Sequence, residues 1–116
     1  KITQNDIRQF QLAKSAVYSG LTAILKEKTI SFESIENLFI SGGFSAKINI
    51  ENAVKSGLLP RKLKDKIVVL NNSSLLGTIK YACEKNDLSV YLKNTEYIDL
   101  STNSCFSYLF IENMEF

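Results

Sequence analysis

The segment LFISGGFS, residues 38–45, decides the fold, because a short apolar run ends there in two glycines. This pattern is typical of a buried strand that stops at a tight turn. A second apolar run, IVVL at residues 67–70, is of the kind found in parallel sheets covered on both faces. Residues 49–57 between the two runs predict a helix that begins after Asn49 and stops at Gly57. This order predicts a right-handed crossover between two parallel strands.

The segment before this strand–helix–strand unit predicts a long amphipathic helix over residues 3–26. Thr3 and Asp6 have the spacing of a capping box, with Asp in place of the usual Glu. Apolar residues follow at helical spacing. They are Ile7, Phe10, Val17, Leu21 and Ile24.

The segment after the unit continues the alternation of helices and strands. Residues 72–85 predict a helix, residues 97–100 a third short strand, and residues 101–114 a last helix that Ser101 caps. The predicted order is therefore α-β-α-β-α-β-α. We expect one α/β domain in which a short, mostly parallel sheet is flanked by helices.

Composition narrows the classes of partner. The chain has 116 residues, 45% of them hydrophobic, and a formal charge of +2, which is too small to predict nucleic-acid binding. The basic stretch at residues 61–66 is interpreted as a solvated connection. Because no apolar run is long enough to span a membrane, we expect a soluble protein without a membrane partner. Cys83 and Cys105 lack metal-site spacing and are expected to be reduced, which predicts a cytoplasmic location.

The residues that commonly carry catalysis are scarce. The chain has no histidine, so it lacks a Ser-His-Asp or Cys-His triad and a histidine zinc site. The carboxylates nearest to element ends are Asp6, Glu51 and Asp99, and helix capping and solvation explain such positions. We therefore expect neither a catalytic residue nor a metal ligand, and no chemistry by this chain alone.

Two consecutive strands end in small or polar residues at the same edge of the predicted sheet. Gly42 and Gly43 follow the first strand, and their backbone N–H groups can approach a phosphate or a ribose. Asn71, Asn72 and Ser73 follow the second. Ligands gather at this edge of α/β sheets. A tight turn and a helix cap explain the same residues without a ligand.

Several motifs in order along the whole chain resemble the reductive activators of corrinoid proteins. The resemblance implies an actin-like ATPase fold, related to sugar kinases and heat-shock chaperones, in which two ribonuclease-H-like lobes close over a nucleotide. Residues 1–116 would form most of the second lobe, the C-terminal part of a larger protein. The motifs are ITQNDIR at 2–8, QLAK at 11–14, GG at 42–43, ENA at 51–53, GLLP at 57–60, NSSLLG at 72–77 and EYIDLS at 96–101.

The resemblance also implies an activity. In this family, ATP hydrolysis helps to transfer an electron from an N-terminal iron-sulfur domain to an inactive Co(II) corrinoid, which returns to Co(I). The implied cofactors are ATP with magnesium and an upstream iron-sulfur cluster, neither held for certain by this segment. The implied partner is a corrinoid iron-sulfur or corrinoid methyltransferase protein, and a homodimer is left open.

Carried onto this sequence, the resemblance places Gly42, Gly43, Phe44 and Ser45 along the adenine and ribose, mainly through backbone contacts. Asn71, Asn72 and Ser73 would lie beside the cleft in a supporting role. The family usually has glycine where Ser45 stands, and often Asn-Tyr at residues 46–47.

Those differences support an alternative, a binding or assembly module that keeps the fold without nucleotide turnover. A small stand-alone enzyme is a third interpretation, with little support because the usual acid-base residues are absent. In the implied fold, three further strands pair beside the strand that ends at Gly43. We therefore expect an exposed sheet edge and self-association of the isolated chain.

Overall fold

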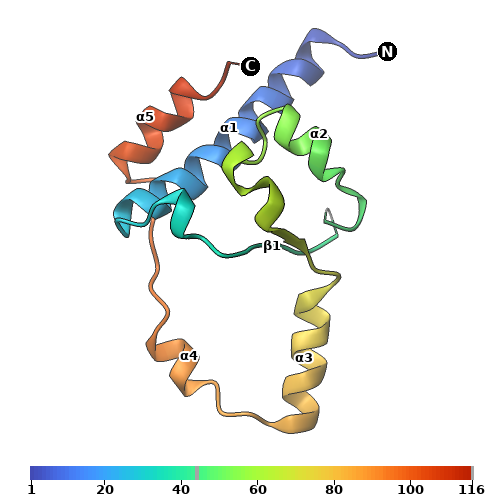
Figure 1. Ribbon diagram of the computed structural model, residues 1–116, viewed down its shortest axis with the longest axis vertical. Coiled ribbons are helices and arrows are strands. Elements are labelled where there is room, and N and C mark those ends of the chain that lie inside the picture. Colours follow the sequence, from blue (N-terminus) through green and yellow to red (C-terminus); the bar gives the residue numbers. More distant parts are fainter. Residues whose placement is uncertain (44, 116) are drawn as a thin grey trace.

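The computed structural model describes residues 1–43 and 45–115 and shows an α/β chain built around one parallel strand pair (Figure 1). The elements divide into a packed body and an arm that leaves it. The body contains α1 (Gln4–Glu27), η1 (Phe32–Ser34), β1 (Leu38–Ile40), η2 (Ser45–Lys47), α2 (Ile50–Lys55), η3 (Arg61–Lys66), β2 (Ile67–Val69) and α5 (Ser104–Glu112). The arm contains α3 (Ser73–Glu84) and α4 (Ser89–Lys93).

The first helix begins as the sequence predicts. The Thr3 side chain accepts a hydrogen bond from the Asp6 backbone N–H, and Asp6 accepts one from the Thr3 N–H at 2.8 Å. This reciprocal pair is a capping box, which satisfies two backbone donors that have no partner inside the helix. The pKa of Asp6 is lowered because its carboxylate accepts hydrogen bonds from the Thr3 side chain and backbone.

Strands β1 and β2 are parallel, as predicted, and Leu38 lies opposite Ile67 and Ile40 opposite Val69. The intervening helix α2 is capped by the Asn49 side chain, again as predicted. Its buried residues pack with Leu59 to form the core beneath the strands. That core contains Ala53, Val54 and Leu59, with Ile40, Ile48, Ile50, Leu58 and Ile67 around it.

The outer edge of β1 is exposed. Among the described residues the sheet has two strands, and Phe39 in the middle of β1 is 59% exposed. An unpaired strand edge can accept another strand. Self-association through this edge stays a prediction.

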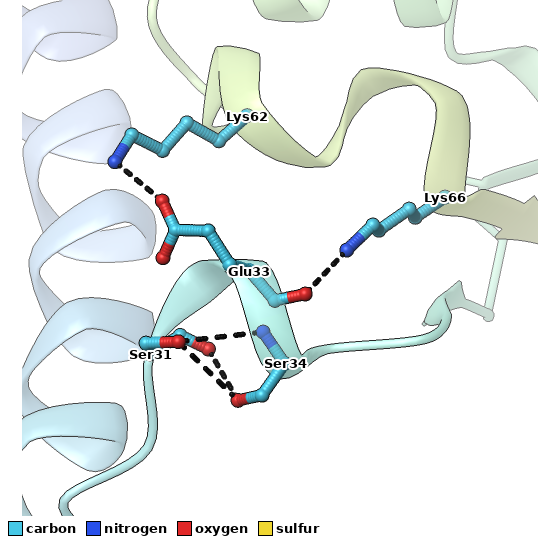
Figure 2. Close-up of polar contacts among 5 residues, drawn as sticks. All are labelled: Ser31, Glu33, Ser34, Lys62 and Lys66. Carbon is cyan, nitrogen blue, oxygen red and sulfur yellow. Dashed lines mark hydrogen bonds and ion pairs between the residues drawn. The ribbon is translucent and has the colours of Figure 1, made fainter.

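The basic stretch at residues 61–66 is more than a solvated connection. It forms η3, whose Leu63 is 0% exposed. Figure 2 shows that lysines of η3 bond to Glu33 of η1. The Lys62 ammonium lies 2.8 Å from the Glu33 carboxylate, and the Lys66 ammonium donates to the Glu33 carbonyl at 2.9 Å. The basic side chains therefore hold the loop before β1 against the helix before β2.

The last helix packs against the first, and it uses polar contacts (Figure 1). The Ser15 hydroxyl donates to the Phe110 carbonyl, and the Asn113 amide donates to Ser19 at 3.4 Å. The contact of α1 with α5 buries Ser15 and Ser19, while Val17 and Ile24 of the predicted apolar spacing are 46% and 40% exposed. The sequence predicts the helix correctly, but Val17 and Ile24 are not among its buried residues.

The arm extends away from the body (Figure 1). All residues of α3 after Ser73 and all residues of α4 after Ser89 are exposed. The Cα radius of gyration is 16.5 Å, against about 13 Å expected for a compact chain of this length. The excess reflects the arm, whose apolar side chains are not buried by the body.

The predicted third strand is wrong. Residues 95–99, all described, have no regular secondary structure, and Tyr97 is 85% exposed. Asp99 accepts hydrogen bonds from the backbone and hydroxyl of Ser101, which turns the chain instead of extending it. The last helix is capped by Asn103 and not by Ser101, because the Ser101 hydroxyl is engaged by Asp99.

Candidate functional site

The ends of β1 and β2 meet, as expected for neighbouring parallel strands. The last ladder hydrogen bond joins the Leu70 N–H to the Ile40 carbonyl at 2.8 Å. Beyond it, the chain after Ile40 turns through the two glycines, and the chain after Leu70 enters α3. The structure thus brings the two predicted groups of site residues to one edge of the sheet.

The glycine turn leaves backbone accessible. Gly42 has φ +97°, a conformation that side chains rarely adopt. Chain neighbours aside, a Cβ placed on Gly42 or on Gly43 meets no described atom within 4 Å, and both residues are exposed. The space next to this backbone is therefore open to a ligand that side chains would otherwise exclude.

Ser45 lies beneath the turn and does not face outward. It is 2% exposed, and its hydroxyl lies 2.7 Å from the Gly42 carbonyl and 2.9 Å from the Leu70 carbonyl. The Ser45 side chain therefore joins the two strand ends. Its contacts are with protein backbone.

The second strand end is organised as a helix N-terminus. The Asn72 side chain accepts a hydrogen bond from the Leu75 N–H at 3.2 Å, which confirms the predicted cap of α3. Asn71 and Asn72 are exposed and Ser73 is half-buried. Within this first turn, the Leu75 N–H is satisfied by Asn72, and the Ser73 N–H faces the Ser41 hydroxyl of the glycine turn.

Ser41 is a residue of this edge that sequence reasoning did not select. Its hydroxyl donates to the Asn71 carbonyl at 3.2 Å, forms a hydrogen bond with the Ser73 hydroxyl, and lies 3.4 Å from the Ser73 N–H. The available signal was a second hydroxyl residue flanking the glycine pair. Phe44, which was also selected, lies outside the described residues.

An apolar hollow of about 520 Å³ opens next to the strand ends. Its volume is in the range of small-molecule pockets. Its lining includes Ser41, the residue that precedes the glycine pair. The lining comes from Ala13, Val17 and Leu21 of α1, from 38–41, and from Ile48, Leu58 and Leu59.

The carboxylates considered for chemistry make local contacts. The pKa of Asp99 is lowered by hydrogen bonds from the Ser101 side chain and backbone, and Glu51 pairs with Lys55 at 2.8 Å. Within residues 1–43 and 45–115, no group of three potential ligands is placed to hold a metal ion. The helices in these same ranges are also too short or too polar for a membrane crossing.

One protein family and two known relatives match this chain over nearly its whole length. Residues 1–116 match the family described as the C-terminal domain of RACo, the ASKHA domain. The chain is 30% identical over 118 residues to the corrinoid activation enzyme RamQ of Eubacterium limosum, a match that covers 99% of this chain and 20% of RamQ. No solved structure matches the chain significantly.

A second relative is the [Co(II) methylated amine-specific corrinoid protein] reductase of Methanosarcina barkeri. It is 24% identical over 116 residues, a match that covers 96% of this chain and 21% of the reductase. The chain therefore spans about a fifth of the length of the curated relatives that it matches.

Proposed function

Because the chain belongs to the family of the C-terminal domain of RACo, the ASKHA domain, we propose that it is the adenosine-binding part of an ATP-dependent reductive activator. The activator returns an inactive Co(II) corrinoid protein to Co(I), with an electron from an iron-sulfur domain elsewhere in the same polypeptide. The observation that carries the proposal is the match over residues 1–116, together with relatives named for corrinoid activation and reduction.

The geometry of the strand ends supports a place for the nucleotide. Gly42 and Gly43 present exposed backbone, and the capped N-terminus of α3 lies next to them through the contact of Ser41 with Ser73. We assign the adenine and ribose to Gly42, Gly43 and Ser45, with Ser45 acting through the backbone it holds, and we extend the assignment to Phe44. Asn71, Asn72 and Ser73 border the cleft as supporting residues.

The nucleotide supplies the driving force when it is bound, since its hydrolysis is coupled to an uphill electron transfer. The residues of this chain orient it, and we assign its phosphates and magnesium to the remaining part of the activator. This division agrees with Asp6, Asp99 and Glu51, whose carboxylates are engaged in a cap, a turn and an exposed ion pair. The corrinoid protein is the proposed partner, and cytoplasmic location is part of the proposal.

The test is calorimetric titration of the complete polypeptide with ATP and magnesium, comparing the wild type with Gly43→Asp. Apart from its chain neighbours, a Cβ at Gly43 meets no described atom within 4 Å, so we expect the Asp side chain to be accommodated at this exposed position. We expect at least about tenfold weaker binding, because the new side chain occupies the space assigned to the adenine and ribose. Ser107→Asp, on an exposed position of α5, is the control for an added charge and should bind ATP normally.

The alternative, a module without nucleotide turnover, predicts a different result. If the folded wild type binds no ATP, the module interpretation replaces the activator, and partner capture becomes the next assay. If Gly43→Asp binds as tightly as the wild type, the activator can stand but its nucleotide is not at the glycine turn.

A further inference from the structure

Two serines flank the glycine pair, and each connects the turn to the end of β2. Ser41 precedes Gly42 and contacts the Asn71 carbonyl and Ser73. Ser45 follows the turn and contacts the Leu70 carbonyl. The turn is thus held at both ends against consecutive residues of the neighbouring strand end. We refer to Ser41 and Ser45 together as the serine clasp.

The clasp begins where the backbone ladder stops. The last ladder contact is between Ile40 and Leu70, so the residues that follow are fixed by side chains. A glycine pair in a turn has more conformational freedom to lose than any other dipeptide. Without the clasp, the distance between the glycine turn and the N-terminus of α3 would be only weakly constrained.

The hydrogen bonds of the clasp can all be formed at once. If the Ser41 proton goes to the Asn71 carbonyl, the Ser73 hydroxyl donates to Ser41, and each proton is used once. The Ser45 proton is shared between two carbonyls, at 2.7 Å to Gly42 and 2.9 Å to Leu70. Its burial means that water does not replace these bonds if the hydroxyl is removed.

We propose that Ser41 and Ser45 are positioning residues for the nucleotide: they preset the distance between the glycine turn and the first turn of α3, without forming the binding surface through their own side chains. The inference rests on the proposed function, to which it adds Ser41 and a defined positioning role for the Ser45 side chain. Presetting a binding site improves affinity because less freedom is lost when the ligand binds. The clasp therefore acts on affinity as well as on stability.

The test uses the complete polypeptide and ATP with magnesium, and it measures the dissociation constant and the thermal midpoint for each variant. Ser41→Ala should weaken ATP binding by about three- to tenfold, the effect of one lost hydrogen-bond connection. Ser41→Thr keeps the hydroxyl at an exposed position and should restore affinity. Ser45→Ala should weaken binding at least as much, with a lower thermal midpoint.

Two serines outside the site provide matched controls. The Ser56 hydroxyl donates to the Ala53 carbonyl at 3.1 Å in a half-buried position, and that of Ser107 donates to the Asn103 carbonyl at 3.3 Å in an exposed one. Ser56→Ala and Ser107→Ala should leave the ATP dissociation constant unchanged, even where the thermal midpoint falls. This separation distinguishes positioning from general stability.

Each outcome supports or overturns the inference. Weaker binding in Ser41→Ala with recovery in Ser41→Thr supports it, and Ser41 keeps the test valid if Ser45→Ala does not fold. Unchanged affinity in the clasp variants overturns the inference but leaves the proposed function intact. An affinity loss of equal size in the control serines also overturns it. A wild type that binds no ATP overturns the proposed function, and the clasp inference with it.

Discussion

The helices α5 and α3 have similar sequence patterns and opposite environments. Both carry apolar residues at helical spacing and both begin with an asparagine cap. In α5, Leu109 is 6% exposed because the helix packs on α1, whereas Leu76 in α3 is 60% exposed. The amphipathic pattern therefore predicts that a helix forms, while the buried fraction depends on a neighbouring surface.

The same difference separates the body from the arm. The body has polar contacts between elements that are distant in sequence, such as those between η1 and η3 in Figure 2. It also has a small core beneath β1 and β2. The arm has local hydrogen bonds and exposed ion pairs, such as that between Lys80 and Glu84. Regions with little buried apolar surface open at low free energy. We expect the body to unfold cooperatively and the arm to open independently.

The largest expected effect comes from a matched pair of leucines. Leu63 is 0% exposed in η3, so Leu63→Ala should lower the free energy of unfolding of the 116-residue chain by about 2–5 kcal/mol. Leu76→Ala, in the arm, should change it by less than about 0.5 kcal/mol. Urea denaturation measures both values. Equal losses in the two variants would show that the arm is packed as tightly as the body.

A matched pair of glycines should show effects of opposite sign. Gly57 has φ +78°, a conformation that L side chains rarely adopt, so Gly57→Ala should destabilise the body by about 1 kcal/mol or more. Gly77 lies inside α3 with open space around it, so Gly77→Ala should raise helix stability by up to about 1 kcal/mol.

The readout for this pair differs by region. Thermal unfolding should report the loss at Gly57, and amide hydrogen exchange in α3 should report the gain at Gly77. If Gly57→Ala is neutral, the turn after α2 is not constrained as the structure describes. If Gly77→Ala slows exchange throughout the body as well, the arm and the body unfold as one unit.

The elements that were predictable from sequence are those with local signals. The capping box at Thr3, the cap at Asn49 and the two apolar runs identify α1, α2 and the parallel pair without reference to distant residues. The edge where Gly42 and Asn71 meet follows from that parallel pairing. These features depend on propensity and periodicity, which the sequence contains directly.

The features that were not predictable depend on long-range partners. The buried side of α1 depends on α5, which is distant in sequence. The Phe110 carbonyl of α5 accepts a hydrogen bond from the Ser15 hydroxyl of α1. The apolar residues at 97–100 suggested a strand, but the Asp99 turn dominates because no neighbouring strand in the described part pairs with them. Ser41 likewise gains its importance from Asn71 and not from its own neighbours.

The smallest expected effect concerns two exposed carboxylates, one in each region. The pKa of Glu33 in the body is lowered mainly by the hydrogen bond from Lys62, and that of Asp87 in the arm by those from Ser89. A lowered pKa in the folded state gives a stabilising contribution that is present above the ordinary pKa and is lost as pH falls through the lowered one. For Glu33, whose ordinary value is 4.5, the loss begins near that pH and continues below it.

This contribution affects global stability only if the group belongs to the unit that unfolds. We therefore expect Glu33→Gln to make the thermal midpoint less dependent on pH below about 4.5, because the charge paired with Lys62 is already absent. Asp87→Asn should leave that dependence unchanged, since the arm opens before the body unfolds. Both exposed groups contribute weakly and are screened by salt, so the comparison requires low ionic strength. If Asp87→Asn also makes the thermal midpoint less dependent on pH in acid, the arm does not open independently. It then unfolds cooperatively with the body.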